Sequence, residues 1–196
     1  MLALILAMTA ANPSPKVQLQ ATIEEVRGVL QSKEATPAKQ ATLRKITKSY
    51  IDFAKLAQET LDGQWGKLSA KQHAEFTKLL EELIEASYIT RLSDSSTVDI
   101  TLNEEKIDGD TAHVAALAHV KGSDTDLRFE LKKGASTWTF ADVVLDDVSL
   151  TNNYRAQFSK TIAKEGYPAL VAKLKKKVAE FKSSTTASAE VAPSKG

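Results

Sequence analysis

The stretch that decides the fold is AHVAALAHVKGSDTDLRFEL, Ala112 to Leu131, in which apolar residues recur at every second position. A period of two places these side chains on one face of an extended chain, so the stretch predicts two strands. The residues of this apolar face are Ala112, Val114, Ala116, Ala118, Leu127, Phe129 and Leu131. Gly122-Ser123-Asp124 separates the two runs and is typical of a turn. We therefore expect an antiparallel hairpin with one apolar face.

The alternation continues on both sides of this hairpin. A run from Val98 to Leu102 precedes it, and a run from Thr137 to Leu145, containing Trp138 and Phe140, follows it. Short polar turns separate all of these runs, and such turns join antiparallel neighbours. The sequence therefore predicts a four-stranded antiparallel meander.

Helical periodicity flanks the strands. Val17 to Gln31 carries apolar residues three and four positions apart, and so does one longer stretch from Thr36 through Ala57. Ser69-Ala70-Lys71-Gln72 is a capping-box sequence and opens the clearest helix of the chain. Helices return at 152–163 and 168–181. Helices, then a sheet, then helices predict an α+β domain.

The two ends of the chain differ from the rest. LALILAMTAA, Leu2 to Ala11, is too short to span a membrane and has the length of a signal-peptide core, although no Lys or Arg precedes it. We expect a signal peptide over residues 1–11, with a buried N-terminal helix as the alternative. The domain is expected over 17–182, and the Ser-, Thr- and Ala-rich residues 183–196 are expected to form a disordered tail.

The composition excludes several classes of function. The chain of 196 residues has 26 Lys and Arg against 25 Asp and Glu, so no basic excess favours nucleic acid. Cysteine is absent, which excludes thiol catalysis, disulfides and Cys-based zinc sites. The sequence has no phosphate-cradling glycine loop, nucleophile elbow or His-Glu metal motif. The sequence therefore carries no motif of these enzyme classes.

The titratable candidates are few. His113 and His119 lie six residues apart on one predicted strand, about 20 Å, so they cannot share a metal ion. We expect both at the rim and His73 to be exposed. Asp142 follows Phe140 on the same predicted face, where it could be a general base or a structural group bonded to backbone amides or to Arg155. We prefer the structural role for Asp142 and for Arg155.

A group of lysines marks the last predicted helix. These residues are Lys173, Lys175, Lys176, Lys177 and Lys182. The simplest interpretation is a solvated helix face. The alternative is a docking patch for anionic headgroups or an acidic partner.

Two groups of motifs follow one another in order along the chain. The first is Tyr50-Ile51-Asp52-Phe53, followed by Leu61, Gly63 and Trp65. The second is Trp138, Asp142, Val148-Ser149-Leu150 and the run from Asn153 to Phe158 (NYRAQF). This ordered series resembles the MlaC family, the toluene-tolerance-type periplasmic phospholipid-binding proteins, and the second group is similar to the family's most specific stretch. The resemblance spans roughly Val17 to Phe181. Gly66, Asp147 and Asp62 depart from the family pattern.

The resemblance implies both fold and function. It implies a nuclear-transport-factor-like cone, in which a curved sheet and helices enclose an apolar pocket. It also implies a periplasmic shuttle that carries phospholipid between an inner-membrane MCE-type lipid transporter and an outer-membrane lipoprotein–porin complex, and so maintains outer-membrane lipid asymmetry. No catalytic residue carries over, so the resemblance implies a binding protein and no enzyme. No cofactor is expected, because the phospholipid is cargo.

The expected pocket lining is the set of apolar residues on the predicted sheet face and facing helices. They are Phe53, Leu56, Phe76, Leu80, Leu83, Ile84, Val114, Ala116, Leu127, Phe129, Trp138 and Phe140. The small residues beside Val114 leave space that either an acyl chain or a closely packed helix would fill. Two alternatives to a lipid carrier are an enzyme or small-molecule-binding domain with Asp142 as base, and an interaction protein whose pocket its own side chains fill.

Overall fold

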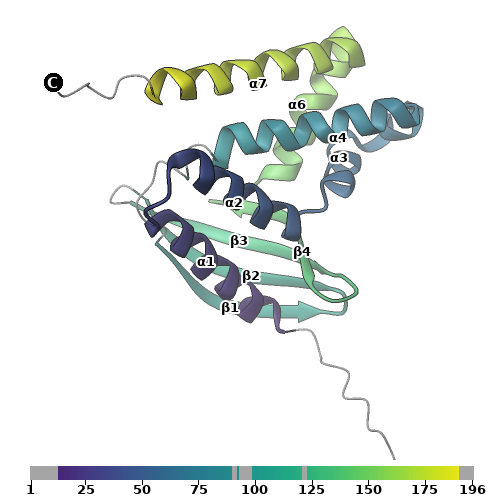
Figure 1. The fold of residues 1–196 in the computed structure, drawn as a ribbon. Helices are drawn as coiled ribbons and strands as arrows, with labels where there is room; N and C mark the ends of the chain where they lie inside the picture. Colours follow the sequence, from purple (N-terminus) through teal and green to yellow (C-terminus); the bar gives the residue numbers. More distant parts are fainter. Residues whose placement is uncertain (1–12, 90–91, 93–98, 121–122, 190–196) are drawn as a thin grey trace, which may run out of the picture.

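The computed structural model describes residues 13–89, 92, 99–120 and 123–189 (Figure 1). The predicted signal peptide, residues 1–11, lies outside these ranges, and so do residues 190–196 of the predicted tail. Among the described helices, none has the length and apolarity that crossing a membrane requires.

The sheet has the predicted antiparallel meander with one short strand added. Its strands are β1 (Ile100–Asp108), β2 (Thr111–Val120), β3 (Ser123–Lys133), β4 (Trp138–Leu145) and β5 (Val148–Ser149), in the order β1-β2-β3-β4-β5. The predicted strand count of four is therefore one too low. β5 pairs with β4 across the turn at Asp146-Asp147, where both residues have positive φ. Aspartate is one of the few non-glycine residues that enter this conformation.

Two N-terminal helices lie over one face of the sheet (Figure 1). They are α1 (Pro15–Gln31) and α2 (Thr36–Tyr50), and α2 is followed by α3 (Phe53–Leu61). The single helix expected from Thr36 through Ala57 is thus wrong. The chain breaks at Ile51, which forms a bridge to Phe140 of β4, and the Asp52 carboxylate then caps α3 by accepting from the Lys55 N–H at 3.0 Å.

The remaining helices form a second layer with its own core. They are the 3₁₀ helix η1 (Asp62–Lys67), α4 (Ala70–Ile84), the π-helix η2 (Glu85–Ile89), α6 (Leu150–Glu165) and α7 (Tyr167–Ala189). The predicted capping box is present, with Ser69 and Gln72 bonded reciprocally. α7 runs beyond the predicted end at Phe181 and enters the segment expected to be a tail. Figure 1 shows α7 packed along α4, with α6 crossing behind them.

Candidate functional site

The face of the sheet beneath α1 is apolar, and we call it the inner face. It carries Ile100, Leu102, Ala112, Val114, Ala116, Leu127, Phe129, Leu131, Trp138, Phe140 and Val143, which form one cluster with Leu19 and Ile23 of α1. Ala112 and Val114 are completely buried beneath the helix. Small side chains at Ala112 and Ala116 let α1 approach the strands, so over this part of the face a helix fills the space that the sequence leaves open.

A buried amide fixes the first turns of α1 to the sheet. The side-chain amide of Gln18 donates through Nε2 to the Trp138 carbonyl at 2.7 Å, and its Oε1 accepts from the Trp138 N–H at 2.8 Å. The same oxygen accepts from the Thr137 hydroxyl at 2.6 Å. Both polar atoms of the buried Gln18 side chain are therefore hydrogen-bonded. Sequence reasoning missed it; a polar residue among the apolar positions of α1 was the only signal.

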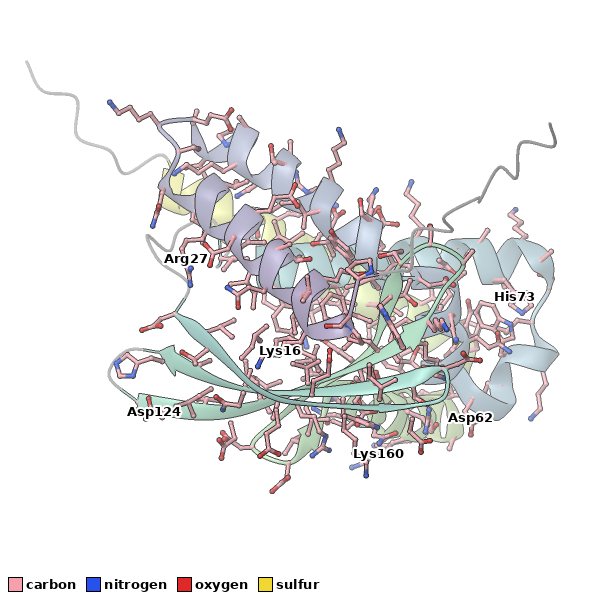
Figure 2. All side chains as sticks on the ribbon, turned by 90° about the horizontal axis from the view of Figure 1, so that it is seen from below. Lys16, Arg27, Asp62, His73, Asp124 and Lys160 are labelled. Atoms are coloured by element: carbon pink, nitrogen blue, oxygen red, sulfur yellow. The ribbon has the colours of Figure 1, made fainter. Side chains whose placement is uncertain are left out.

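Beyond these turns α1 diverges from the sheet. In Figure 2 the helix lies on the strands near Lys16 and is well separated at Arg27 from the strand end that carries Asp124. Leu30, in the last turn of α1, packs instead with Leu43 and Ile46 of α2. At this end of the strands three apolar residues of the inner face, Ile100, Leu102 and Leu127, are half-buried, whereas Ala116 and Ala118 between them on β2 are buried. We call the three half-buried residues the open end of the inner face.

The structure divides the twelve predicted lining residues between two cores. Val114, Ala116, Leu127, Phe129, Trp138 and Phe140 belong to the inner face. Phe76, Leu80, Leu83, Leu56 and Ile84 belong to the core of the helical layer, and Phe53 is buried at the start of α3. The side chains that share the inner face therefore form one candidate surface, whereas the helical residues form another.

Two cavities lie against α4. One, of about 520 Å³, is bordered by Ala54, Trp65, Ala70, His73, Ala74, Thr77, Lys78 and Glu81. The other, of about 160 Å³, is bordered by Leu83, Tyr154, Gln157, Phe158, Thr161, Leu170, Lys173, Leu174 and Lys177. Burial raises the pKa of the Tyr154 hydroxyl, which lies 3.5 Å from the Tyr88 hydroxyl. Of the predicted lining residues, all of which the structure describes, only Leu83 borders either cavity.

Asp142 is a structural residue on the opposite face from Phe140. The register of β3 against β4 shifts between Glu130 and Leu131, so Phe140 and Asp142 face opposite sides, and the predicted shared face is wrong. The Asp142 carboxylate accepts from the N–H groups of Val143 (2.9 Å) and Thr151 (3.0 Å) and from the Ser149 hydroxyl. These donors occupy both carboxylate oxygens of Asp142, which lies beside the N-terminus of α6. Nothing in this arrangement therefore favours a role for Asp142 as a general base.

Arg155 is also structural, but its partner differs from the predicted one. Its Nε donates to the Glu59 carbonyl of α3 at 2.8 Å, and its Nη1 donates to the Asn152 side chain at 3.0 Å. The predicted bond to Asp142 is therefore wrong. Arg155 joins α6 to the last turn of α3, where carbonyl groups lack helical partners.

The three histidines do not form a common site. His119 bonds Asp124 across the β2–β3 hairpin at 2.8 Å, which raises its pKa. His113 lies 3.8 Å from Glu130 on the outer face. His73 is half-buried rather than exposed, because its ring stacks on Trp65 at 3.9 Å. Within the described ranges there is no group of three His, Cys, Asp or Glu residues placed to hold a metal ion.

The lysines of α7 are mostly engaged with acids. Lys175 pairs with Glu75 at 2.6 Å and Lys182 with Glu82 at 2.9 Å, both on α4, and Lys173 pairs with Glu165 of α6 at 2.6 Å. These pairs favour the solvated-face interpretation over a docking patch on α7. They also hold α7 along the edge of α4.

The fold and the inner face define an α+β domain whose curved sheet presents an apolar surface to covering helices. Comparison with protein families identifies the particular class. The model of the family described as MlaC protein matches residues 20–176, and the chain belongs to this family.

Solved structures give a matching fold. A phospholipid-binding protein from Ralstonia solanacearum, solved in complex with a phospholipid, superposes with a TM-score of 0.74 over 85% of this chain and 97% of its own, at 16% sequence identity. The predicted α+β fold class is thereby confirmed. A search of curated proteins finds no match.

Proposed function

We propose that this protein binds the acyl chains of a phospholipid against the open end of the inner face and carries the lipid through water. The observation that carries the proposal is the half-buried apolar surface of Ile100, Leu102 and Leu127, where α1 has left the sheet. Membership of the MlaC family and the phospholipid-bound structure of the same fold support it.

The energetics require such a surface. A phospholipid tail has about 15 methylenes, and at roughly 0.8 kcal/mol for each, removing one tail from water is worth on the order of 12 kcal/mol. A carrier must replace most of this apolar contact, yet must not exceed it by much, or release would be too slow. Phe140 and Val143, half-buried on the neighbouring strand, extend the surface along which a chain can lie.

The location and partners of the carrier form the finer part of this proposal. We propose that it works in the periplasm, after removal of residues 1–11. There it exchanges phospholipid with an inner-membrane MCE-type transporter and an outer-membrane lipoprotein–porin complex, which would maintain the lipid asymmetry of the outer membrane. The family match supports this assignment.

Lipid extraction tests the proposal. Undenatured protein purified from bacteria and extracted with organic solvent is expected to yield close to one phospholipid per chain by mass spectrometry. Leu127→Glu places a charge on the inner face and is expected to lower that yield several-fold. Leu117→Glu makes the same substitution at a half-buried leucine on the outer face, on β2, and is the matched control.

Two outcomes contradict the proposal. One is wild-type protein that repeatedly contains no lipid although it is folded by circular dichroism. The other is an equal loss of lipid in both variants while both keep the wild-type melting temperature.

A further inference from the structure

The cavity of about 520 Å³ lies on a face of α4 that the helical core does not use. Its α4 residues, Ala70, His73, Ala74, Thr77, Lys78 and Glu81, recur at three and four positions and so form one stripe. The core residues of α4, such as Phe76 and Leu80, face elsewhere. We call the stripe, with Ala54 and Trp65, the α4 groove.

The α4 groove has a small-residue floor and an aromatic end wall. Ala54, Ala70 and Ala74 are exposed and leave room above the helix backbone. The Trp65 ring stacks on the His73 ring with an interplanar angle of 10°, and His73 Nε2 bonds the Trp65 carbonyl at 2.9 Å. These contacts fix the wall, so the groove does not depend on a ligand for its shape.

The rim of the α4 groove is basic. Lys78 borders the groove. Lys55, Lys67 and Lys71 lie one or two positions in sequence after the lining residues Ala54, Trp65 and Ala70. All four are exposed, and none forms an ion pair with any acid that the structure describes, in contrast to the paired lysines of α7. The rim also holds Lys48, which pairs with Glu81 at 2.5 Å. Asp62 of η1 offsets part of this charge.

We propose that the α4 groove docks an acidic segment of a partner protein. Charge complementarity selects an acidic occupant, because Lys78 borders the groove without an acidic partner in the described structure and Lys55, Lys67 and Lys71 are sequence neighbours of its lining residues. We choose a protein segment because the α4 stripe extends over about 17 Å of helix, a length that a helix or loop of a partner can follow. A flat lipid surface is instead met by protruding apolar residues, and the exposed large apolar residues Val17, Tyr88, Ile107 and Val148 lie outside the groove.

The α4 groove is remote from the open end of the inner face. In Figure 2, His73 lies at one end of the molecule, whereas Arg27 and Asp124 lie at the other. A partner held in the groove would therefore leave the open end uncovered. The inference is independent of lipid binding, and its test uses no lipid-dependent readout.

The experiment uses the full chain and an acidic amphipathic peptide of glutamate, alanine and leucine. A peptide of about 15 residues spans the groove, since Ala70 to Glu81 cover about 17 Å of helix. Binding is followed by protection of Trp65 from acrylamide; Trp138, the other tryptophan, is buried and gives a constant background. We expect micromolar-range protection that weakens as salt rises.

Matched variants test the location. Lys71→Glu with Lys78→Glu is expected to weaken peptide binding about tenfold or more, as is Ala74→Gln, which fills the floor without changing charge. Lys160→Glu with Lys164→Glu makes the same charge change on α6, at exposed lysines without ion pairs in the described structure, and is expected to change binding less than about twofold.

Several results would overturn the proposal. These are no protection by the peptide, equal weakening in the α6 control, or no effect of Ala74→Gln. Phosphatidylglycerol vesicles that bind more tightly than the peptide and lose binding through Lys71 and Lys78 would assign the groove to a membrane. Sedimentation showing groove-dependent dimers would assign it to a second copy.

Discussion

Asp142 provides the sharpest test of how the sheet is joined to the C-terminal helices. Its carboxylate accepts three hydrogen bonds, two from backbone N–H groups and one from Ser149, the N-cap of α6. Asp142→Asn keeps one oxygen for the two N–H groups, and its amide can donate to the Ser149 oxygen. Asp142→Ala removes all three bonds.

The magnitudes follow from these contacts. A bond to a charged acceptor contributes about 1.5–3 kcal/mol when buried, and about 1 kcal/mol is reasonable at this half-buried position. Asp142→Ala is therefore expected to lower the free energy of unfolding by about 3 kcal/mol. Asp142→Asn loses mainly the attraction between the charge and the helix N-terminus, about 1 kcal/mol. For a chain of this size these losses correspond to melting temperatures lower by roughly 6–12 °C and 2–4 °C.

Thermal unfolding by circular dichroism and urea titration measure both variants. Asp126→Asn is the control, because Asp126 is exposed on β3 and its carboxylate makes no hydrogen bond within the described structure. Phospholipid content should stay at the wild-type level in Asp142→Asn. The reasoning is refuted if Asn and Ala destabilise equally, or if neither does. A folded Asp142→Asn protein that loses its lipid would also refute the structural role.

Three further predictions concern other local contacts. Gln18→Met should lower the free energy of unfolding by about 2–4 kcal/mol in urea titrations, because Trp138 loses partners for its buried N–H and carbonyl groups; a change below about 1 kcal/mol contradicts this. Asp147→Gly should raise the free energy of unfolding by about 0.5–1 kcal/mol, because φ is 64° at this position and glycine adopts positive φ at no steric cost. Destabilisation by this substitution would show that the Asp147 side chain is needed. By NMR titration, Asp124→Asn should lower the His119 pKa. The raised folded-state pKa means that this pair stabilises the hairpin below the ordinary histidine pKa and ceases to do so as pH rises through the raised value; an unchanged pKa in the variant refutes the pairing.

The periodic parts of the fold could be predicted from the sequence. Alternation between Ala112 and Leu131 depends only on which side chains are apolar, and the capping box at Ser69 is a local hydrogen-bonding pattern. Both are therefore visible without tertiary contacts. The break at Ile51 was missed because the apolar spacing of a helix continues through it, and only the bridge to Phe140 reveals it.

The parts that depend on register or on distant partners could not be predicted. The register of β3 against β4 shifts between Glu130 and Leu131, and this bulge places Asp142 on the opposite face from Phe140. Alternation of apolar residues in the sequence does not reveal such an inserted residue. Arg155 was matched to the wrong partner because the Glu59 carbonyl is 96 positions away in sequence. The candidate lining residues were chosen for apolarity, which does not distinguish the inner face from the helical core.

The position of a bound acyl chain tests the central claim most directly. A phospholipid with a photoreactive diazirine near the end of one chain can be loaded into the protein, irradiated, and mapped by peptide mass spectrometry. We predict that the label attaches to the open end of the inner face, at Ile100, Leu102 or Leu127. Attachment at Tyr154 or Leu174 beside the smaller cavity, or at Arg128 on the outer face, would contradict the account.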